Sequence, residues 1–564
     1  MSITLRETVY TTTFFYVVYR CLIFLLYKSP FRELSGPKPA SWAMGNLGQL
    51  FNAKGLPFHR SLRELYGGMV RVYGFFGDEQ LYISDPSALY TIMTKEQDAF
   101  EETAVFTETN RIIFGPGLVS TTGAQHARQR RVVNPIFAVP HLRRLSPVFY
   151  EIADKLADVI AAEIDSKCNR EESSDSQFES PRAVVDMSEW MCRVALESVG
   201  RTVLGYSFDP LDSPHNNPYT SAIKELIPTL FSLSLVRQFA PFLAKLGPPS
   251  FRRKTVELIP HGAVQKVKNM SDVMHDTAVD ILRQKREEIA KEDGVDVTKA
   301  KDIISILSNE EAKANGGEEL SDAELTGQMT VLIFGAQDTT SSCLSRVLHQ
   351  LSVHRRVQDD LRKEILEAMR NTATFAEHNG HLDYDTLSRL PVLDAVLKET
   401  LRLYPPIPFV RRSAVRDIVL PYSRAPDGIS DMASVRVPSG TIVFVDIAGS
   451  NSLTSVWGED AGEWKPERWL EGNSGVKNSG LRLPGVYSGM MSFLAGERSC
   501  VGYKFALLEM KIILATLISR FTFSATDDEI VWNLAQIISP SMCVTSEEGM
   551  TTEKKGLPLI VEII

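Results

Sequence analysis

The sequence predicts a mainly α-helical protein in which a few short β-strands form small sheets at the periphery. Most of residues 56–403 carry apolar side chains at helical spacing. One such pattern continues from Ser321 to Leu351 without interruption, which indicates a long helix inside the domain. The strand-like runs are short and scattered, as expected of peripheral sheets, and lie at residues 70–73, 81–83, 410–420, 442–445 and 557–564.

Composition and charge exclude several classes of protein. The chain has 564 residues, of which 44% are hydrophobic and 23% charged, as in an ordinary globular protein. A net charge of −9 argues against a nucleic-acid partner, because binding phosphates requires a dense basic surface. No glycine-rich dinucleotide fingerprint and no P-loop motif occurs. The five cysteines other than Cys500 show no Cys-x-x-Cys spacing and no even-spaced framework, which suits a reducing compartment.

The N-terminus differs in character from the rest of the chain. Residues 10–27 are apolar and aromatic, apart from three threonines and Arg20, and at about 1.5 Å per residue they are just long enough to cross a bilayer. Lys28 and Arg32 follow, and a basic flank favours the cytoplasmic side for what comes after it. A helix lying in the membrane interface is the alternative. We therefore expect a membrane anchor at residues 1–28, a basic and proline-containing hinge at residues 29–40, and a single packed domain at residues 41–564.

Two polar segments predict surface loops. Residues 165–182 and 309–319 are rich in Ser, Glu and Asn and have no helical or strand period. The second segment ends at a capping box from Ser321 to Glu324, which begins the long helix. To Leu351 this helix is roughly 45 Å long, enough to cross a whole domain.

Cys500 lies in the most informative part of the chain, Phe-Leu-Ala-Gly-Glu-Arg-Ser-Cys-Val-Gly. Gly496 and Gly502 on either side predict a tight loop that approaches a flat, bulky group. Arg498 supplies a cation for an acidic group on that ligand. Residues 503–520 have helical spacing, so the sulfur stands at a helix N-terminus, which stabilises a thiolate. Such a thiolate suits a metal ligand, and an axial ligand to haem is one option.

This loop resembles the haem-binding signature of the cytochrome P-450 family, Phe-x-x-Gly-x-Arg-x-Cys-x-Gly, with every conserved position present. The resemblance extends over nearly everything after residue 35. It implies the cytochrome P-450 fold, with haem b between the long central helix and the cysteine loop, so that residues 41–564 form a haem-thiolate domain. It also implies that Cys500 is the axial ligand of the iron and that Phe493, Arg498 and Gly502 belong to the cofactor site.

The long helix contains a second motif, Phe-Gly-Ala-Gln-Asp-Thr-Thr. Gly335 and Ala336 present small side chains that a flat ligand can approach, and the polar residues that follow predict a local distortion of the helix. The motif resembles the oxygen-binding motif of cytochromes P-450, with Ala336 in place of its second glycine. The resemblance implies that Thr339 donates a hydrogen bond to dioxygen and that Asp338 gates the delivery of protons.

Two further patterns concern the support of the cofactor. Glu399 and Arg402 share one helix face and resemble the family's buried Glu-x-x-Arg pair, which meets a second arginine, here Arg468. The resemblance gives these three residues a role in holding the scaffold on the haem side.

The haem propionates require cationic partners. His126 and Arg130, four residues apart, resemble the family's Trp-x-x-x-Arg helix with histidine in place of tryptophan. Arg412 matches the family's strand arginine, although a shift by one residue to Arg411 is an alternative. The resemblance implies that His126, Arg130, Arg412 and Arg498 bind the propionates.

The function implied by the resemblance is that of a monooxygenase, an oxidoreductase that inserts one atom of dioxygen into a lipophilic small molecule, in secondary or lipid metabolism. No flavin module follows Cys500, so we expect electrons from a separate NADPH-dependent flavoprotein reductase. Its acidic surface would meet the basic side chains on the cysteine side, Arg128, Arg131, Lys504 and Lys511. The resemblance also implies membrane attachment, at the endoplasmic reticulum with the catalytic domain facing the cytoplasm.

Two other functions are compatible with a haem-thiolate loop. One is an isomerase or dehydratase that uses no dioxygen. Family members of that kind tend to lose the acid–threonine pair, which is present here as Asp338 and Thr339. The other is a non-enzymatic membrane protein that binds haem or lipid, which should have lost a conserved residue of the cysteine loop. The expected substrate contacts are mostly apolar, which indicates a lipophilic substrate and nothing narrower, and lie at residues 106–114, 226–231, 332–336, 407–410 and 538–540.

Overall fold

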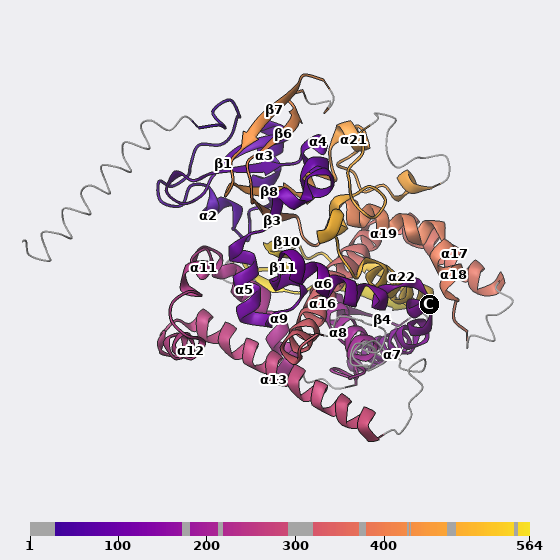
Figure 1. The fold of residues 1–564 in the computed structure, drawn as a ribbon. Coiled ribbons are helices and arrows are strands. Elements are labelled where there is room, and N and C mark those ends of the chain that lie inside the picture. The colour runs from indigo at the N-terminus through magenta and orange to yellow at the C-terminus, as the bar shows by residue number, and fades with distance from the viewer. Residues whose placement is uncertain are drawn as a thin grey trace, which may run out of the picture.

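The computed structural model describes residues 29–171, 181–212, 218–291, 320–371, 380–425, 428, 430–470, 481–545 and 551–564. The expected membrane anchor at residues 1–28 and the loop predicted at residues 309–319 lie outside these ranges. Within these ranges no helix combines the length and the apolar character that a membrane span requires. The fold is mostly helical with small separate sheets, which confirms the predicted fold class (Figure 1).

Helices account for most of the described chain. Up to the central helix they are α2 (Leu47–Leu50), α3 (Leu56–Tyr66), α4 (Pro86–Tyr90), α5 (Ala104–Phe114), α6 (Gly123–Val133), α7 (Val139–Glu171), α8 (Met187–Val199), α9 (Pro218–Ser232), α10 (Ser234–Arg237), α11 (Ala240–Leu243), α12 (Pro249–Leu258) and α13 (Gly262–Lys291). From the central helix on they are α16 (Asp322–Val353), α17 (Arg355–Asn371), α18 (Tyr384–Arg389), α19 (Pro391–Leu403), α20 (Ile447–Ser450), α21 (Thr454–Trp457) and α22 (Tyr503–Arg520).

The predicted long helix is α16, and it runs through the middle of the helical part (Figure 1). Its capping box is present: the Glu324 backbone N–H donates to Ser321 Oγ over 3.3 Å, and the Ser321 N–H donates to Glu324 Oε2 over 3.0 Å. Helices α8, α13 and α22 pack against it. Because most of its side chains are buried around its whole circumference, α16 is an interior helix and not an amphipathic surface helix.

One loop prediction was partly wrong. The segment predicted as a loop from residue 165 continues as α7 up to Glu171, while residues 172–180 lie outside the described residues. Lys167 explains the helix locally, because its ammonium pairs with Glu163 one turn earlier over 2.6 Å and also donates to the Val184 carbonyl over 2.7 Å. Polar composition alone does not exclude a helix whose side chains can pair along one face.

The strands form small sheets around the helices. The largest has the order β1-β2-β8-β5-β3 and is mainly antiparallel, with β2 and β8 parallel. The run predicted at residues 410–420 forms two strands, β5 and β6, and the other predicted runs correspond to β1, β2, β8 and β13. The strands are β1 (Met69–Tyr73), β2 (Glu79–Ile83), β3 (Phe100–Glu102), β4 (Arg182–Asp186), β5 (Phe409–Ala414), β6 (Ile418–Ser423), β7 (Met432–Val437), β8 (Ile442–Asp446), β9 (Phe521–Ala525), β10 (Ile530–Ala535), β11 (Ile537–Thr545), β12 (Thr551–Lys555) and β13 (Pro558–Ile563).

The segment expected to act as a hinge packs against the first sheet. Phe31 and Leu34 are buried in the main hydrophobic core. The Arg71 backbone N–H donates to the Ser35 carbonyl over 3.0 Å, and a Cβ on Gly36 would lie 1.9 Å from the Arg71 carbonyl oxygen. The packing of the catalytic domain therefore begins within residues 29–40.

Candidate active site

Cys500 stands on a loop that is held on both sides. It follows a 3₁₀ turn (Gly496–Arg498) and precedes α22, and its backbone N–H donates to the Phe493 carbonyl over 2.9 Å. Gly496 has φ of +66°, and a Cβ there would lie 2.1 Å from the Met93 carbonyl oxygen, so this position requires glycine. The Phe493 ring packs on Tyr503, with centroids 5.9 Å apart. The loop is thus anchored at its start and at the beginning of the helix.

The surroundings of Cys500 act on its thiol in two directions. Its side chain is exposed, yet protein surrounds it closely enough that burial raises the pKa of the thiol. A hydrogen bond from the Gly502 backbone and the charge of Arg130 act in the opposite direction, toward the thiolate. A Cβ on Gly502 would contact nothing nearer than the Phe137 ring at 3.7 Å, so packing against protein does not explain that glycine.

The central helix borders open space at the predicted motif. Gly335 is exposed in the middle of an otherwise buried helix, and a Cβ there would meet no atom within 4 Å. Ala336 and Thr339 on the same stretch are half-buried. The expected distortion does not interrupt the helix, because the Thr339 hydroxyl donates to the Gly335 carbonyl one turn back, over 2.7 Å, within regular α16.

Asp338 lies in a setting suited to proton exchange. Burial raises the pKa of its carboxyl to about 6, and only the charge of Lys555 on β12 opposes this shift. A carboxyl that titrates near neutral pH can both accept and release protons during a reaction.

Glu509 on α22 is a buried acid that was not predicted from the sequence. It is fully buried, and neither carboxyl oxygen has a hydrogen-bond partner of regular geometry. The hydroxyls of Ser198 and Thr340 lie nearby and lower the pKa of this carboxyl, but burial outweighs them and raises it well above its usual range. A glutamate among the apolar residues of a buried helix was the signal that could have revealed it.

The four residues expected to bind the propionates lie together. Burial, together with the neighbouring charges of Arg498, Arg130 and Arg412, lowers the pKa of His126 to about 4. His126 is therefore neutral and stands among three guanidinium groups. The strand geometry also decides between the two candidate strand arginines: neighbours in a strand point to opposite faces, and Arg412 lies in this cluster whereas Arg411 does not.

The acidic residues of β3 pair with part of this cluster. Arg412 bonds Glu102 Oε1 over 2.8 Å, and Arg498 bonds Glu101 Oε1 over 2.5 Å. Arg412 Nη2 is nevertheless buried without a hydrogen-bond partner. An orphaned guanidinium nitrogen is costly, so this side of the cluster calls for a further anion.

Arg130 contacts the cysteine loop itself. Its Nη1 donates to the Ser499 carbonyl over 2.7 Å and its Nη2 to Ser499 Oγ over 3.0 Å. The α6 helix is thereby tied to the residue next to Cys500.

The predicted buried ion-pair network has the expected geometry. Glu399 accepts hydrogen bonds from Arg402 Nη2 over 2.7 Å and Nε over 2.8 Å. It also accepts from Arg468 Nε over 3.3 Å and from Trp469 Nε1 over 2.9 Å. Both Glu399 and Arg402 are fully buried, so the pair belongs to the packed scaffold and not to the surface.

The structure corrects part of the predicted reductase surface. Lys511 is buried, and its ammonium bonds Asp394 Oδ1 over 2.9 Å, so its predicted exposure to a partner was wrong. Arg128 pairs with Glu324 across α6 and α16. Arg131 and Lys504 are exposed.

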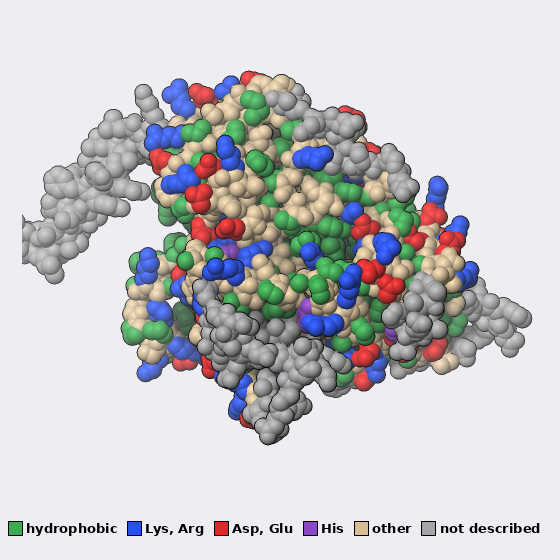
Figure 2. Space-filling view, turned by 45° about the vertical axis from the view of Figure 1, so that its right-hand side comes forward, with side chains coloured by type: hydrophobic (Ala, Val, Ile, Leu, Met, Phe, Trp, Pro, Cys, Tyr) green, Lys and Arg blue, Asp and Glu red, His purple; other side chains and the backbone are tan. Residues whose placement is uncertain are grey.

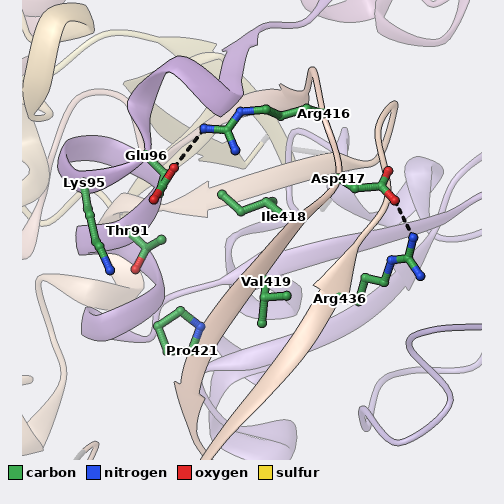
Figure 3. A pocket seen from close by; sticks show the side chains of 9 residues that line it. All are labelled: Thr91, Lys95, Glu96, Arg416, Asp417, Ile418, Val419, Pro421 and Arg436. Atoms are coloured by element: carbon green, nitrogen blue, oxygen red, sulfur yellow. Dashed lines mark hydrogen bonds and ion pairs between the residues drawn. The ribbon is translucent and has the colours of Figure 1, made fainter.

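A separate surface pocket contains none of the predicted site residues. It has a volume of about 370 Å³ and lies between the end of α4 and the β6–β7 hairpin (Figure 3). Its charged side chains already pair with one another, Arg416 with Glu96 over 2.8 Å and Arg436 with Asp417 over 2.6 Å. We therefore look to the cysteine loop and α16 for the chemistry.

The residues present fit haem b. Open space beside Gly335 and beside the Cys500 sulfur matches a flat group held between them, and the unpartnered Arg412 Nη2 matches a propionate oxygen. Held there by Cys500, haem would supply the activation of dioxygen.

Comparison with known proteins agrees with this site. The cytochrome P-450 family model matches residues 35–542. The chain is 40% identical to cytochrome P-450 monooxygenase 91 of Postia placenta over 541 residues, covering 95% of this chain and 96% of the relative. It is 36% identical to ganoderic acid synthetase of Ganoderma lucidum over 537 residues, covering 94% of both chains. The chain belongs to the cytochrome P-450 family of haem-thiolate monooxygenases, whose cofactor is haem b.

Proposed function

We propose that this chain is a membrane-attached monooxygenase of secondary or lipid metabolism. It inserts one oxygen atom into a lipophilic substrate, so that substrate, dioxygen, NADPH and a proton give hydroxylated product, NADP⁺ and water. The observation that carries this proposal is the exposed thiol of Cys500 directly before α22, with Asp338 and Thr339 both present on α16. The name of the Ganoderma relative, ganoderic acid synthetase, supports a place in secondary metabolism.

Each polar residue of the site has a proposed task. The Cys500 thiolate holds the haem iron, and His126, Arg130, Arg412 and Arg498 hold the propionates. Asp338, with a pKa of about 6, takes protons from solvent and releases them into the site.

Thr339 completes the proton path. Its hydroxyl donates to the Gly335 carbonyl over 2.7 Å. To donate to dioxygen, as the family motif implies, the hydroxyl has to turn away from this carbonyl and into the site.

Membrane attachment is supported by an apolar surface on the described residues. Trp42, Phe76, Phe75 and Phe239 form a chain of ring contacts, with centroids 5.7, 6.2 and 5.5 Å apart in that order. This chain joins the N-terminal segment to α11, and both lie on the same side of the molecule (Figure 1). The patch continues with large exposed side chains on and beside α11 and α12: Phe242, Leu243, Leu246, Phe251 and Leu258. Contiguous exposed apolar surface of this kind is typical of membrane contact.

We place the protein at the endoplasmic reticulum with its catalytic domain toward the cytoplasm, where a separate NADPH-dependent flavoprotein reductase can reach it. One face of the molecule has a hollow lined with hydrophobic side chains, and Lys and Arg side chains stand around it (Figure 2). Exposed basic residues such as Arg131 and Lys504 suit an acidic reductase surface.

The test is the absorption spectrum of the purified holoprotein after reduction and exposure to carbon monoxide. Cys500→Ser should lose the thiolate band, because a hydroxyl is not deprotonated under these conditions. Cys543→Ser, on β11, is the matched control and should keep the band and the turnover of the wild type. A Cys500→Ser protein with an unchanged band and turnover would refute the ligand assignment.

A further inference from the structure

Two arginines on the far side of β5 from the propionate cluster lie close to each other. Arg411 is the strand neighbour of Arg412 and points to the opposite face, and Arg237 ends the short helix α10. Burial, together with the positive charge of Arg237, lowers the pKa of Arg411 to about 10. Burial likewise lowers the pKa of Arg237 to about 10. Both groups remain cations at neutral pH, although they repel one another.

Neither cation has a carboxylate partner among the described residues. Arg411 Nη1 donates to Gln238 Oε1 over 3.0 Å, and this amide is neutral. Arg237 Nη1 has only long contacts, 3.4 Å to the Leu230 carbonyl and 3.5 Å to Gln536 Oε1. The Nε of Arg237 is buried without any hydrogen-bond partner. The two guanidiniums therefore keep unused donors and an uncompensated charge, which is costly unless an anion joins them.

One acid acts on Arg411 from the other face of the strand. The charge of Glu102 raises the pKa of Arg411, but its carboxylate bonds Arg412 at 2.8 Å. It is therefore already engaged in the propionate cluster, and it does not neutralise the pair on the far face.

The surroundings of this arginine pair are aromatic. The Arg411 guanidinium lies over the Phe51 ring at 5.0 Å from its centroid, and Phe51 in turn contacts Phe231 and Phe409 at 6.5 and 6.1 Å. Phe231 and Phe409 belong to two of the segments expected to contact substrate. Such ring contacts by themselves would explain Arg411 as a structural residue. They do not explain Arg237, which has no ring beneath it in the described part of the chain.

The third element at this place is strained. Gln536 lies in the turn between β10 and β11 with φ of +70°, in the left-handed region that non-glycine residues rarely adopt. Its side-chain oxygen is the one that reaches Arg237. Strained residues persist where surrounding structure holds them, and they are concentrated at ligand sites.

We propose that Arg237 and Arg411 form an anion-binding subsite that takes the carboxylate of an amphipathic substrate, whose apolar body lies along the aromatic side chains of Phe51, Phe231 and Phe409. This inference rests on the proposed monooxygenase function and narrows its substrate class to lipophilic acids. Two guanidiniums from different elements can bind the two oxygens of one carboxylate, and such charge-assisted bonds are strong where water is excluded.

The experiment is a spectral titration of the holoprotein with matched pairs of ligands, each an acid and its methyl ester. A linear pair, hexadecanoic acid and methyl hexadecanoate, and a fused-ring pair, abietic acid and methyl abietate, cover two shapes. We expect at least one acid to bind about ten to a hundred times more tightly than its ester. The double variant Arg237→Gln/Arg411→Gln should lose that preference while its affinity for the ester stays within about twofold.

The controls separate this inference from the function on which it rests. Arg416→Gln removes an arginine of the same charge from a pocket elsewhere and should keep the preference for the acid. The reduced, CO-bound spectrum reports the haem-thiolate site whichever ligand binds, so its loss would refute the function and not the subsite alone. The proposed subsite is wrong if no acid in the panel binds more tightly than its ester. It is also wrong if the preference for the acid survives the double substitution.

A lipid phosphate is the other source of an anion at a membrane-facing site. Binding to vesicles of phosphatidylcholine, with and without phosphatidylglycerol, distinguishes the two. If the double variant binds the anionic vesicles more weakly and keeps the acid–ester preference, the arginines hold a lipid headgroup and the assignment to substrate is wrong.

Discussion

Replacing Glu399 by glutamine should prevent the protein from holding haem stably. Glu399 is fully buried and accepts four side-chain hydrogen bonds, two of them from Arg402 at 2.7 and 2.8 Å. The substitution keeps the shape of the side chain but removes its charge. It therefore leaves the buried guanidinium of Arg402 without a counter-charge, whereas Arg468 keeps its ion pair with Asp460 at 2.9 Å.

The size of the effect follows from this geometry. Breaking a buried ion pair by removing one partner costs about 3–5 kcal/mol, because the remaining charge stays desolvated. A domain has roughly 5–15 kcal/mol of total stability, so the variant would lose a large share of it. Arg402 still donates to the carbonyls of Asn451 and Ala461, at 2.8 and 2.7 Å, which limits the loss. We expect an unfolding free energy lower by about 3–5 kcal/mol.

The assay is urea unfolding of the holoprotein, followed by haem absorption and by far-UV circular dichroism. Asp272→Asn is the matched control, because Asp272 also accepts two hydrogen bonds from one arginine, Arg253, both of 2.7 Å, but at the surface. It should cost no more than about 1 kcal/mol. If the two substitutions cost the same, burial is not what makes the Glu399 network important.

Four other variants test the remaining assignments. Thr339→Ala should bind haem and substrate normally but divert reducing equivalents to hydrogen peroxide, with product per NADPH falling about tenfold; unchanged coupling would remove Thr339 from the proton path. The carboxyl of Glu509 has a raised pKa in the fold, so the unfolding free energy of the wild type should fall as the pH rises above about 4.5 toward that pKa. Glu509→Gln should flatten this dependence between pH 5 and 8, and an identical slope in both proteins would mean that the acid is ionised in the fold. Deleting residues 1–28 should leave a protein that folds, binds haem and partitions less to membranes, whereas deleting residues 1–36 also removes the buried Phe31 and Leu34 and should abolish haem binding; equal behaviour of the two truncations would show that the segment is not part of the core.

Local patterns were enough to predict several elements closely. The capping box at Ser321 placed the start of α16 to the residue, because a cap is made by side chains within one turn. The extent of α22 was predicted in the same way from its apolar spacing. Short strands such as β3 and β4 were missed, since a strand of this kind is stabilised by a partner far away in the chain, and its own sequence carries little signal.

For the candidate site, too, some features could be predicted from local sequence and others could not. Cys500, Asp338, Thr339 and the propionate-binding residues stand in short motifs, so the sequence by itself was sufficient to name them and, by resemblance, to indicate haem-thiolate chemistry. Burial and pairing depend on distant segments, and only the tertiary structure decided them. It buried Lys511 against Asp394, put Glu509 beside Thr340, and turned Arg411 away from Arg412 toward Arg237. The physical reason is that desolvation and charge pairing act through space, between residues that no spacing along the chain brings together.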